Sequence, residues 1–170
     1  MLSALGVALV FLIHFSIFPA APFLEYDPAD IPILFVTLIF GPLAGLVMTF
    51  IVSIVQGLTV SASSGFVGIF MHIVATGSMV IAVGLVRKWF ASRPRLSLIL
   101  SGVAGVVTMT IVMVLLDLVI MPLYMNVPLA VVIDLIWYII AFNLIKAGIN
   151  VIVSLGLFIP LKKVLKRFLF

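Results

Sequence analysis

The 170-residue chain is too apolar for a water-soluble fold, because 66% of its residues are hydrophobic, only 8% are charged and the mean hydropathy is +1.53. A soluble domain carries about 25% charged residues, and much of any folded surface stays exposed. We therefore expect lipid to solvate the outside of the chain. The absence of cysteine excludes disulfides, thiolate metal sites and cysteine nucleophiles. The net charge of +4 is interpreted as a signal of membrane orientation, and we expect no nucleic-acid partner.

Six apolar segments follow one another in a single predicted transmembrane domain, residues 1–170. Their approximate bounds are 1–18, 31–40, 43–56, 66–86, 96–123 and 131–168. Because Gly41-Pro42 interrupts one long apolar stretch, residues 31–56 form either one kinked span or two short helices. Polar loops are expected at Glu25–Asp30 and Gly57–Ser64, and Asp30 can cap the helix that follows it.

The basic residues predict an orientation in the membrane. Eight of the nine lie either between Arg87 and Arg95 or in the C-terminal tail after Ile159. Two spans separate these clusters, so both lie on one side, which the positive-inside rule assigns to the cytoplasm. Charge alone does not decide between five helices and six.

Lys146 is the remaining basic residue, and it lies near the middle of the last span. A charge at that depth costs about 2.5–3.5 kcal/mol, so its side chain needs a carboxylate, a cavity or a ligand. Asn143 and Asn150 share its helix face. Two interpretations stay open: an internal ion pair with Asp117 or Asp134, or a ligand site.

Other polar residues are less informative. Asp117 and Asp134 are expected at the water interface, although a pocket is the alternative, and His14 and His72 are expected to be packed or hydrogen-bonded. The acidic loop is either a plain connection or a lid. No phosphate-binding loop is present, so ATP-driven work would need a partner. Ala4 and Ala8 form a small-residue stripe that suits either docking of another helix or ordinary packing.

Three segments carry a resemblance to a known family. Phe18-Pro, Glu25-Tyr-Asp-Pro-Ala-Asp-Ile-Pro and Phe40-Gly-Pro-Leu-Ala-Gly resemble the substrate-binding S-components of energy-coupling factor (ECF) vitamin transporters. Asn143-Leu-Ile-Lys-Ala-Gly-Ile-Asn150 is similar to the riboflavin-specific members of that family. The likeness covers nearly the whole chain in order and length.

The resemblance implies an all-α integral membrane protein: a six-transmembrane-helix bundle with both termini cytoplasmic, in the bacterial cell membrane. It implies riboflavin as transported ligand, no cofactor, no enzymatic activity, and a partner complex of an ECF transmembrane coupling subunit and two ATP-binding-cassette ATPases. Asn143 and Lys146 match positions that bind the flavin edge, and Ala4 and Ala8 match the docking face. From their positions, we expect the ligand site to be completed by Leu24, Tyr26, Asp27, Gln56 and Met71.

Three alternatives make different structural predictions. The same scaffold could bind another vitamin such as thiamine, in which case pocket carboxylates should face the cationic ligand. A small intramembrane enzyme requires Asp117, Asp134 and His72 to converge on one cavity. A scaffold protein without a ligand predicts that Lys146 is buried against an acid with no space beside it.

Overall fold

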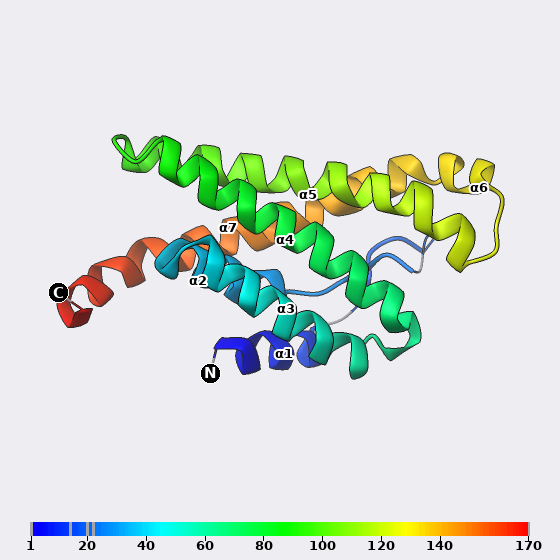
Figure 1. Cartoon of the computed structure of the whole chain (residues 1–170), viewed down its shortest axis with the longest axis horizontal. Coiled ribbons are helices and arrows are strands. Elements are labelled where there is room, and N and C mark those ends of the chain that lie inside the picture. Colours follow the sequence, from blue (N-terminus) through cyan, green and yellow to red (C-terminus); the bar gives the residue numbers. More distant parts are fainter. Residues whose placement is uncertain (1, 14, 20, 22, 170) are drawn as a thin grey trace.

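The computed structural model describes residues 2–13, 15–19, 21 and 23–169, with the side chains of residues 2, 63 and 162–169 outside the description. Helices dominate this part of the chain, and most run along one long axis (Figure 1). The elements are α1 (Leu2–Leu12), β1 (Phe15–Ser16), β2 (Glu25–Tyr26), α2 (Asp30–Phe40), α3 (Pro42–Leu58), the 3-10 turn η1 (Ala62–Ser64), α4 (Gly65–Trp89), α5 (Pro94–Tyr124), α6 (Leu129–Asp134) and α7 (Ile136–Leu169).

Three of the described helices are long and apolar enough to cross a membrane: Gly65–Trp89, Pro94–Tyr124 and Ile136–Leu161. The first two helices, α1 and α2, have 11 residues each. At the helical rise per residue, 11 residues reach about 16 Å, roughly half of a hydrocarbon core about 30 Å thick. Neither α1 nor α2 therefore crosses a bilayer without help from its flanking segments.

Residues Gly41 and Pro42 form a tight turn between two helices. Gly41 has φ +91°, a conformation that glycine adopts without steric cost, and Pro42 opens α3 at a first-turn position. A Cβ atom at Gly45 would collide with Thr37, so α2 and α3 pack closely on either side of the turn. The structure thus divides the 31–56 stretch into two helices, as one of the two sequence interpretations required.

The surface of α5 shows how the apolar helices divide into lipid and protein faces. A stripe of exposed apolar residues repeats every fourth position along it: Ile99, Val103, Val107, Ile111, Leu115, Val119 and Leu123. The buried stripe contains small and polar residues as well as apolar ones: Ser101, Gly102, Gly105, Met109, Asp117 and Met121. Small residues let neighbouring helices approach closely when lipid provides no hydrophobic drive. Accordingly Gly105 lies against α4, and Gly102 lies against α7.

The first predicted helix is too long. Residues 1–18 were expected to be helical, but α1 ends at Leu12. Beyond it, Phe15–Ser16 pairs antiparallel with Glu25–Tyr26, and these backbone hydrogen bonds replace the helical ones. The last predicted helix, 131–168, is also divided, because α6 ends at Asp134 and α7 begins at Ile136. The bounds of α2 to α5 differ from the expected ones by at most three residues at either end.

The two ends of the bundle have different compositions. The α4–α5 connection, the α2–α3 turn and the C-terminal part of α7 lie at one end of the long axis (Figure 1). Both predicted basic clusters fall on segments at that end. The paired strands β1 and β2, the start of α4, and α6 lie at the opposite end, which we call the loop end (Figure 1).

Candidate binding site

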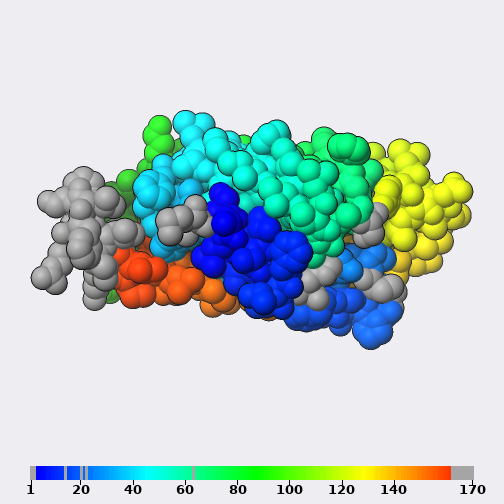
Figure 2. All heavy atoms as spheres, turned by 90° about the horizontal axis from the view of Figure 1, so that it is seen from below, coloured from blue at the N-terminus to red at the C-terminus, as the bar shows by residue number. Residues whose placement is uncertain are grey.

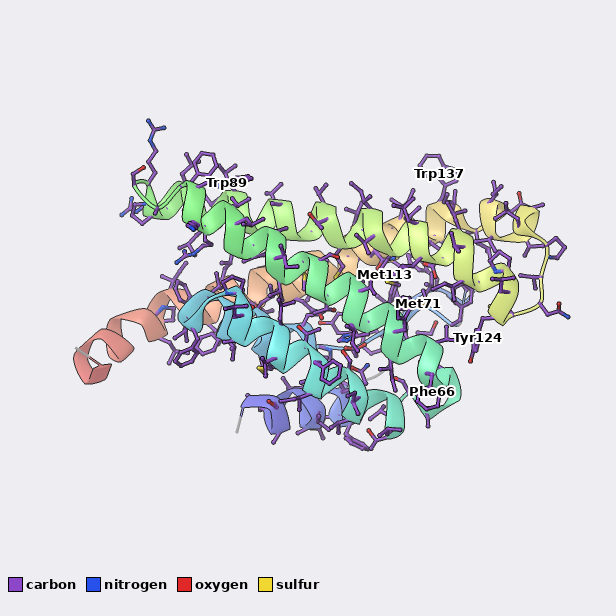
Figure 3. The ribbon with its side chains drawn as sticks, viewed as in Figure 1. Phe66, Met71, Trp89, Met113, Tyr124 and Trp137 are labelled. Atoms are coloured by element: carbon purple, nitrogen blue, oxygen red, sulfur yellow. The ribbon has the colours of Figure 1, made fainter. Side chains whose placement is uncertain are left out.

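A cavity of about 220 Å³ opens between α3, α4, α5 and α7, and the loop before α2 forms part of its wall. Most of its lining is apolar. Five of the chain's eight methionines contribute: Met71, Met109, Met113, Met121 and Met125. Figure 3 shows Met71 on α4 and Met113 on α5 in the middle of the bundle, with Tyr124 nearer the loop end. Methionine is flexible and polarizable, so such walls adapt well to a flat aromatic ring.

Lys146 and Asp27 form a buried ion pair at the cavity wall, with Nζ 2.8 Å from Oδ2. Asp27 also accepts hydrogen bonds from Gln56 Nε2 at 3.2 Å and from the Ala29 backbone N–H at 3.1 Å. Burial alone would raise the pKa of Asp27, but the nearby Lys146 ammonium outweighs it and lowers the pKa below its ordinary value. Because an ammonium has three donors, Lys146 can keep this partner and still donate to a ligand.

Asn150 connects the loop before α2 to α7. Its side-chain oxygen accepts a hydrogen bond from the Tyr26 hydroxyl at 3.0 Å, and its Nδ2 donates to Asp30 Oδ2 at 3.1 Å and to the Asp27 carbonyl at 3.4 Å. Burial raises the pKa of the Tyr26 phenol, so the hydroxyl stays a donor at neutral pH. These bonds hold the loop against α7, beside the Lys146–Asp27 pair.

His72 takes part in a second set of polar contacts beside the cavity. Its Nδ1 lies 2.7 Å from Ser53 Oγ, and its Nε2 lies 3.5 Å from Asp30 Oδ1. Thr76 donates to the same Asp30 oxygen at 2.9 Å. His72 is therefore hydrogen-bonded, as expected from the sequence, whereas His14 lies outside the described residues.

Six of the seven residues predicted to bind ligand line the cavity: Leu24, Asp27, Gln56, Met71, Asn143 and Lys146. Tyr26 is the exception, because its ring is buried and its hydroxyl points to Asn150. Asn143 is 1% exposed, and its Nδ2 donates to the Ile139 carbonyl at 2.9 Å. Ligand contact at these positions stays a prediction. Ser53 also lines the cavity but was not predicted from the sequence, although its place on the same face of α3 as Gln56 was a signal for it.

The predicted partner of Lys146 was wrong. The ion-pair interpretation, one of the two left open, named Asp117 or Asp134, but the carboxylate comes from Asp27, which is 119 residues away along the chain. The acidic loop folds back onto α7, and no local spacing could have indicated that contact. Asp134 is exposed on α6, in agreement with an interface position, whereas Asp117 is 5% exposed and lines the cavity.

Two alternative interpretations fail on these positions. An enzyme using Asp117, Asp134 and His72 needs all three in one cavity, and Asp134 is not among the lining residues. A ligand-free scaffold predicts no space beside Lys146, yet Lys146 faces a cavity. The geometry defines a different class: a multi-pass membrane protein with an internal, mostly apolar pocket and a few convergent polar groups.

Comparison with known proteins identifies the family. Residues 1–161 match the substrate-specific component of ECF transporters, and the chain belongs to that family. It is 30% identical to the riboflavin transporter RibU of Streptococcus thermophilus, over 98% of this chain and 82% of that protein. A solved structure of the S component of a bacterial ECF transporter matches with a TM-score of 0.83 and 32% identity, over 98% of this chain and 94% of that one.

Proposed function

We propose that this chain is the riboflavin-binding subunit of an ECF-type vitamin importer, and that it captures the vitamin outside the cell. The observation that carries the proposal is the cavity, which combines methionine-rich walls with the Lys146, Asn143 and Gln56 side chains. The near full-length similarity to a riboflavin transporter supports the choice of ligand. Riboflavin is cargo in this proposal, so neither a cofactor nor covalent chemistry takes part.

Riboflavin has two polar parts, the edge of its ring and its sugar-alcohol tail, and the cavity offers polar side chains for each. The flavin ring is flat, and its polar edge carries two carbonyl acceptors beside one N–H donor. Lys146 and Asn143 offer N–H donors for that edge, while the methionine side chains and Leu24 pack against the ring faces. The sugar-alcohol tail then extends toward Asp27 and Gln56.

We further propose that six membrane-embedded helices, α1 to α5 and α7, place both termini in the cytoplasm. The basic α4–α5 connection and the C-terminal part of α7 share one end of the bundle, and α1 begins toward that end (Figure 1). The positive-inside rule assigns basic connections to the cytoplasm. The cavity lies toward the loop end, so it faces the outside in this orientation.

A docking face for the ECF coupling subunit is proposed on α1. Figure 2 shows α1 on the surface of the bundle, next to α2 and α3. A Cβ atom at Gly6 would meet Pro32 and Val52, so that side of α1 packs inward. Ala4 and Ala8, two positions away on either side, are exposed. The energy for release inside would come from two ATP-binding-cassette ATPases bound to that coupling subunit.

The function is tested by purifying the protein in detergent from cells grown in rich medium. The proposal predicts a yellow preparation that releases about one riboflavin per chain on denaturation and quenches the fluorescence of added riboflavin when stripped. A colourless preparation that also fails to quench riboflavin would exclude the flavin.

Another vitamin of the same transporter class is the second candidate, because Asp117 places a carboxyl group in the cavity without a cationic partner among the described residues. A carboxylate there would suit a cation such as thiamine. Competition of thiamine with riboflavin for the stripped protein separates the two ligands: the flavin proposal predicts no displacement by excess thiamine.

A further inference from the structure

The end of the bundle that holds the α4–α5 connection has a large excess of positive charge. Two segments contribute to it, the connection with its flanking turns and the C-terminal part of α7, and both lie at this end (Figure 1). Their eight basic residues are Arg87, Lys88, Arg93, Arg95, Lys162, Lys163, Lys166 and Arg167. The five acidic residues all belong to other segments of the chain: Glu25, Asp27, Asp30, Asp117 and Asp134. The chain therefore supplies no acidic side chain from these segments to neutralise the basic end.

Three of the basic side chains in and beside the connection are exposed: Lys88, Arg93 and Arg95. No ion pair or side-chain hydrogen bond joins any of them to another described residue. Arg87 differs, because it is half-buried and its guanidinium lies 5.4 Å from the centre of the Phe158 ring on α7. Arg87 is thus engaged in a contact within the bundle, whereas the other three charges are available to a partner outside it.

The connection that carries these charges is a short turn held by hydrogen bonds. The Arg93 backbone N–H donates to the Phe90 carbonyl at 3.0 Å, and the Ser97 N–H donates to the Arg93 carbonyl at 2.8 Å. The buried Ser97 hydroxyl donates to the Arg87 carbonyl at 3.3 Å, which ties the start of α5 to the end of α4. These bonds fix the backbone from which the three exposed bases extend, so their charges stay near one another.

Aromatic residues indicate the level of these charges in a membrane. Trp89 follows Lys88 and is 71% exposed, while Trp137 is 75% exposed. Figure 3 shows both on the outside of the bundle, toward opposite ends. Tryptophan is enriched at the headgroup level on both sides of a bilayer. The exposed apolar stripe of α5 begins nearby at Ile99. The three exposed bases therefore lie where the phosphates of the lipids are expected.

We propose that Lys88, Arg93 and Arg95 form a binding surface for the headgroup of an anionic phospholipid. This goes beyond the proposed function, since it concerns the lipid around the bundle and not the ligand in the cavity, which none of the three lines. A small anion from water would need an enclosed site. A phospholipid is already held at this level by its acyl chains, so exposed charges can select its negative headgroup, and an arginine fork can donate two hydrogen bonds to one phosphate.

The test measures which lipids the purified protein retains. The full chain in detergent is incubated with equal amounts of phosphatidylglycerol and phosphatidylcholine of identical acyl chains, and the bound lipids are counted by native mass spectrometry. Both lipids contain a phosphate, but only phosphatidylglycerol has a net negative charge. We expect the wild-type protein to retain phosphatidylglycerol preferentially, and we expect added salt to weaken the preference, because salt screens exposed charges.

Neutralising the three bases should remove this preference. Because one basic residue near an anionic surface strengthens association about fivefold, the ratio of bound phosphatidylglycerol to phosphatidylcholine should fall at least about tenfold in Lys88→Gln/Arg93→Gln/Arg95→Gln. The matched control keeps the charges and should keep the ratio within about twofold: Lys88→Arg/Arg93→Lys/Arg95→Lys. Riboflavin binding and the unfolding temperature without added lipid should be unchanged in both, since these side chains neither line the cavity nor pair with a described residue.

The C-terminal part of α7 provides a second comparison, because it also carries basic residues at this end. Lys162→Gln/Lys163→Gln/Lys166→Gln should keep most of the preference for phosphatidylglycerol. The proposal is overturned if the wild-type protein shows no preference, if the neutralised connection keeps the wild-type ratio, or if only the α7 variant loses it.

Two other occupants of the surface give distinct results. Displacement of the bound lipid by millimolar inorganic phosphate would overturn the proposal by revealing a site for a free anion. An unchanged lipid ratio in the neutralised connection, together with lost riboflavin uptake by cells that contain the whole transporter, would overturn it by assigning the surface to a protein partner.

Discussion

Lys146 and Asp27 compensate each other's charge inside the bundle. Their side chains are 9% and 5% exposed, and each is the nearest counter-charge of the other at 2.8 Å. Removing one member of such a buried pair costs about 3–5 kcal/mol, because the other charge is left without compensation. The pair therefore has a structural role beside any role in ligand binding.

Lys146→Met is expected to lower both the thermal stability and the riboflavin affinity, because it leaves Asp27 unpaired and removes a pocket donor. The double variant Asp27→Asn/Lys146→Met removes both charges of the pair. It should recover most of the lost stability but not the affinity. Thermal unfolding and fluorescence quenching in detergent check the two effects separately, and recovery of affinity in the double variant would contradict a ligand contact by Lys146.

The same pair makes the stability of the folded protein depend on pH in the acidic range. The pKa of Asp27 lies below its ordinary value of 3.8, so the folded protein binds fewer protons than the unfolded chain near that pH. The stabilisation is fully present above the unfolded pKa and is lost as the pH falls through the lowered folded pKa. We expect no contribution from this pair to pH dependence between pH 8 and about 5, and a decline in unfolding temperature below about pH 4.

The double variant provides a matched comparison for the loss of stability below about pH 4. In Asp27→Asn/Lys146→Met the decline below about pH 4 should be shallower, although Asp30 remains as a buried carboxylate with its own hydrogen bonds. Unfolding temperatures of both proteins over a pH series measure the difference. Identical acid limbs would show that Asp27 does not carry the effect.

At the scale of single helices, glycines set how closely the elements approach. A Cβ atom at Gly45 would collide with Thr37 on α2 and crowd Val80 on α4, whereas one at Gly148 on α7 would meet nothing within 4 Å. Overpacking costs about 1–3 kcal/mol, while glycine inside a helix is about 1 kcal/mol less favourable than alanine. Gly45→Ala should therefore lower the unfolding temperature, and Gly148→Ala should leave it unchanged or raise it.

The docking face proposed on α1 predicts a separation of binding from transport. Ala8→Trp adds bulk to an exposed position, so riboflavin binding by the purified protein should be unchanged. Uptake of labelled riboflavin by cells that contain the whole transporter should fall strongly, because the bulky ring keeps the coupling subunit at a distance. Val107→Trp, on the exposed stripe of α5, is the control and should preserve uptake. Normal uptake in Ala8→Trp would place the docking face elsewhere.

These elements also show what the sequence could predict. The bounds of α2 to α5 followed from apolar length, while the division at Gly41-Pro42, which the residues alone left open, followed from the family resemblance. The early end of α1 could not be predicted, because the short strands β1 and β2 pair with each other and compete with the helix. For the site, a lone lysine within a span indicated Lys146 and its helix neighbour Asn143. Its partner Asp27 came from a loop whose fold depends on tertiary contacts.

Asp117 is the clearest case of a cavity residue whose position could not be predicted from the sequence. Apolar residues occur on both faces of α5, so hydropathy alone does not show which face is buried. The buried face is marked by glycine, serine and methionine, and Asp117 lies among them. An acid near the end of an apolar span suggested the water interface. The structure places it in the cavity because α5 continues to Tyr124, seven residues further.

The proposed direction in the membrane rests on an asymmetry of the whole molecule. The basic segments gather at one end of the long axis, and the cavity lies toward the other (Figure 1). With positive residues inside, a pocket at the loop end faces the medium, which is the direction required for capturing a scarce vitamin. The opposite orientation would present the pocket to the cytoplasm and make the same geometry useless for import.

This direction can be measured directly, because the chain contains no cysteine. Ala91 in the α4–α5 connection and Ala130 on α6 are both exposed alanines, one at each end of the bundle. We expect a membrane-impermeant thiol reagent to label Ala130→Cys in intact cells, and to label Ala91→Cys only after the membrane is permeabilised. The two variants control for each other in side-chain size and exposure. Labelling of Ala91→Cys alone in intact cells would invert the molecule and contradict capture of riboflavin from outside, whereas the expected pattern would place the Lys146–Asp27 pocket on the outer side.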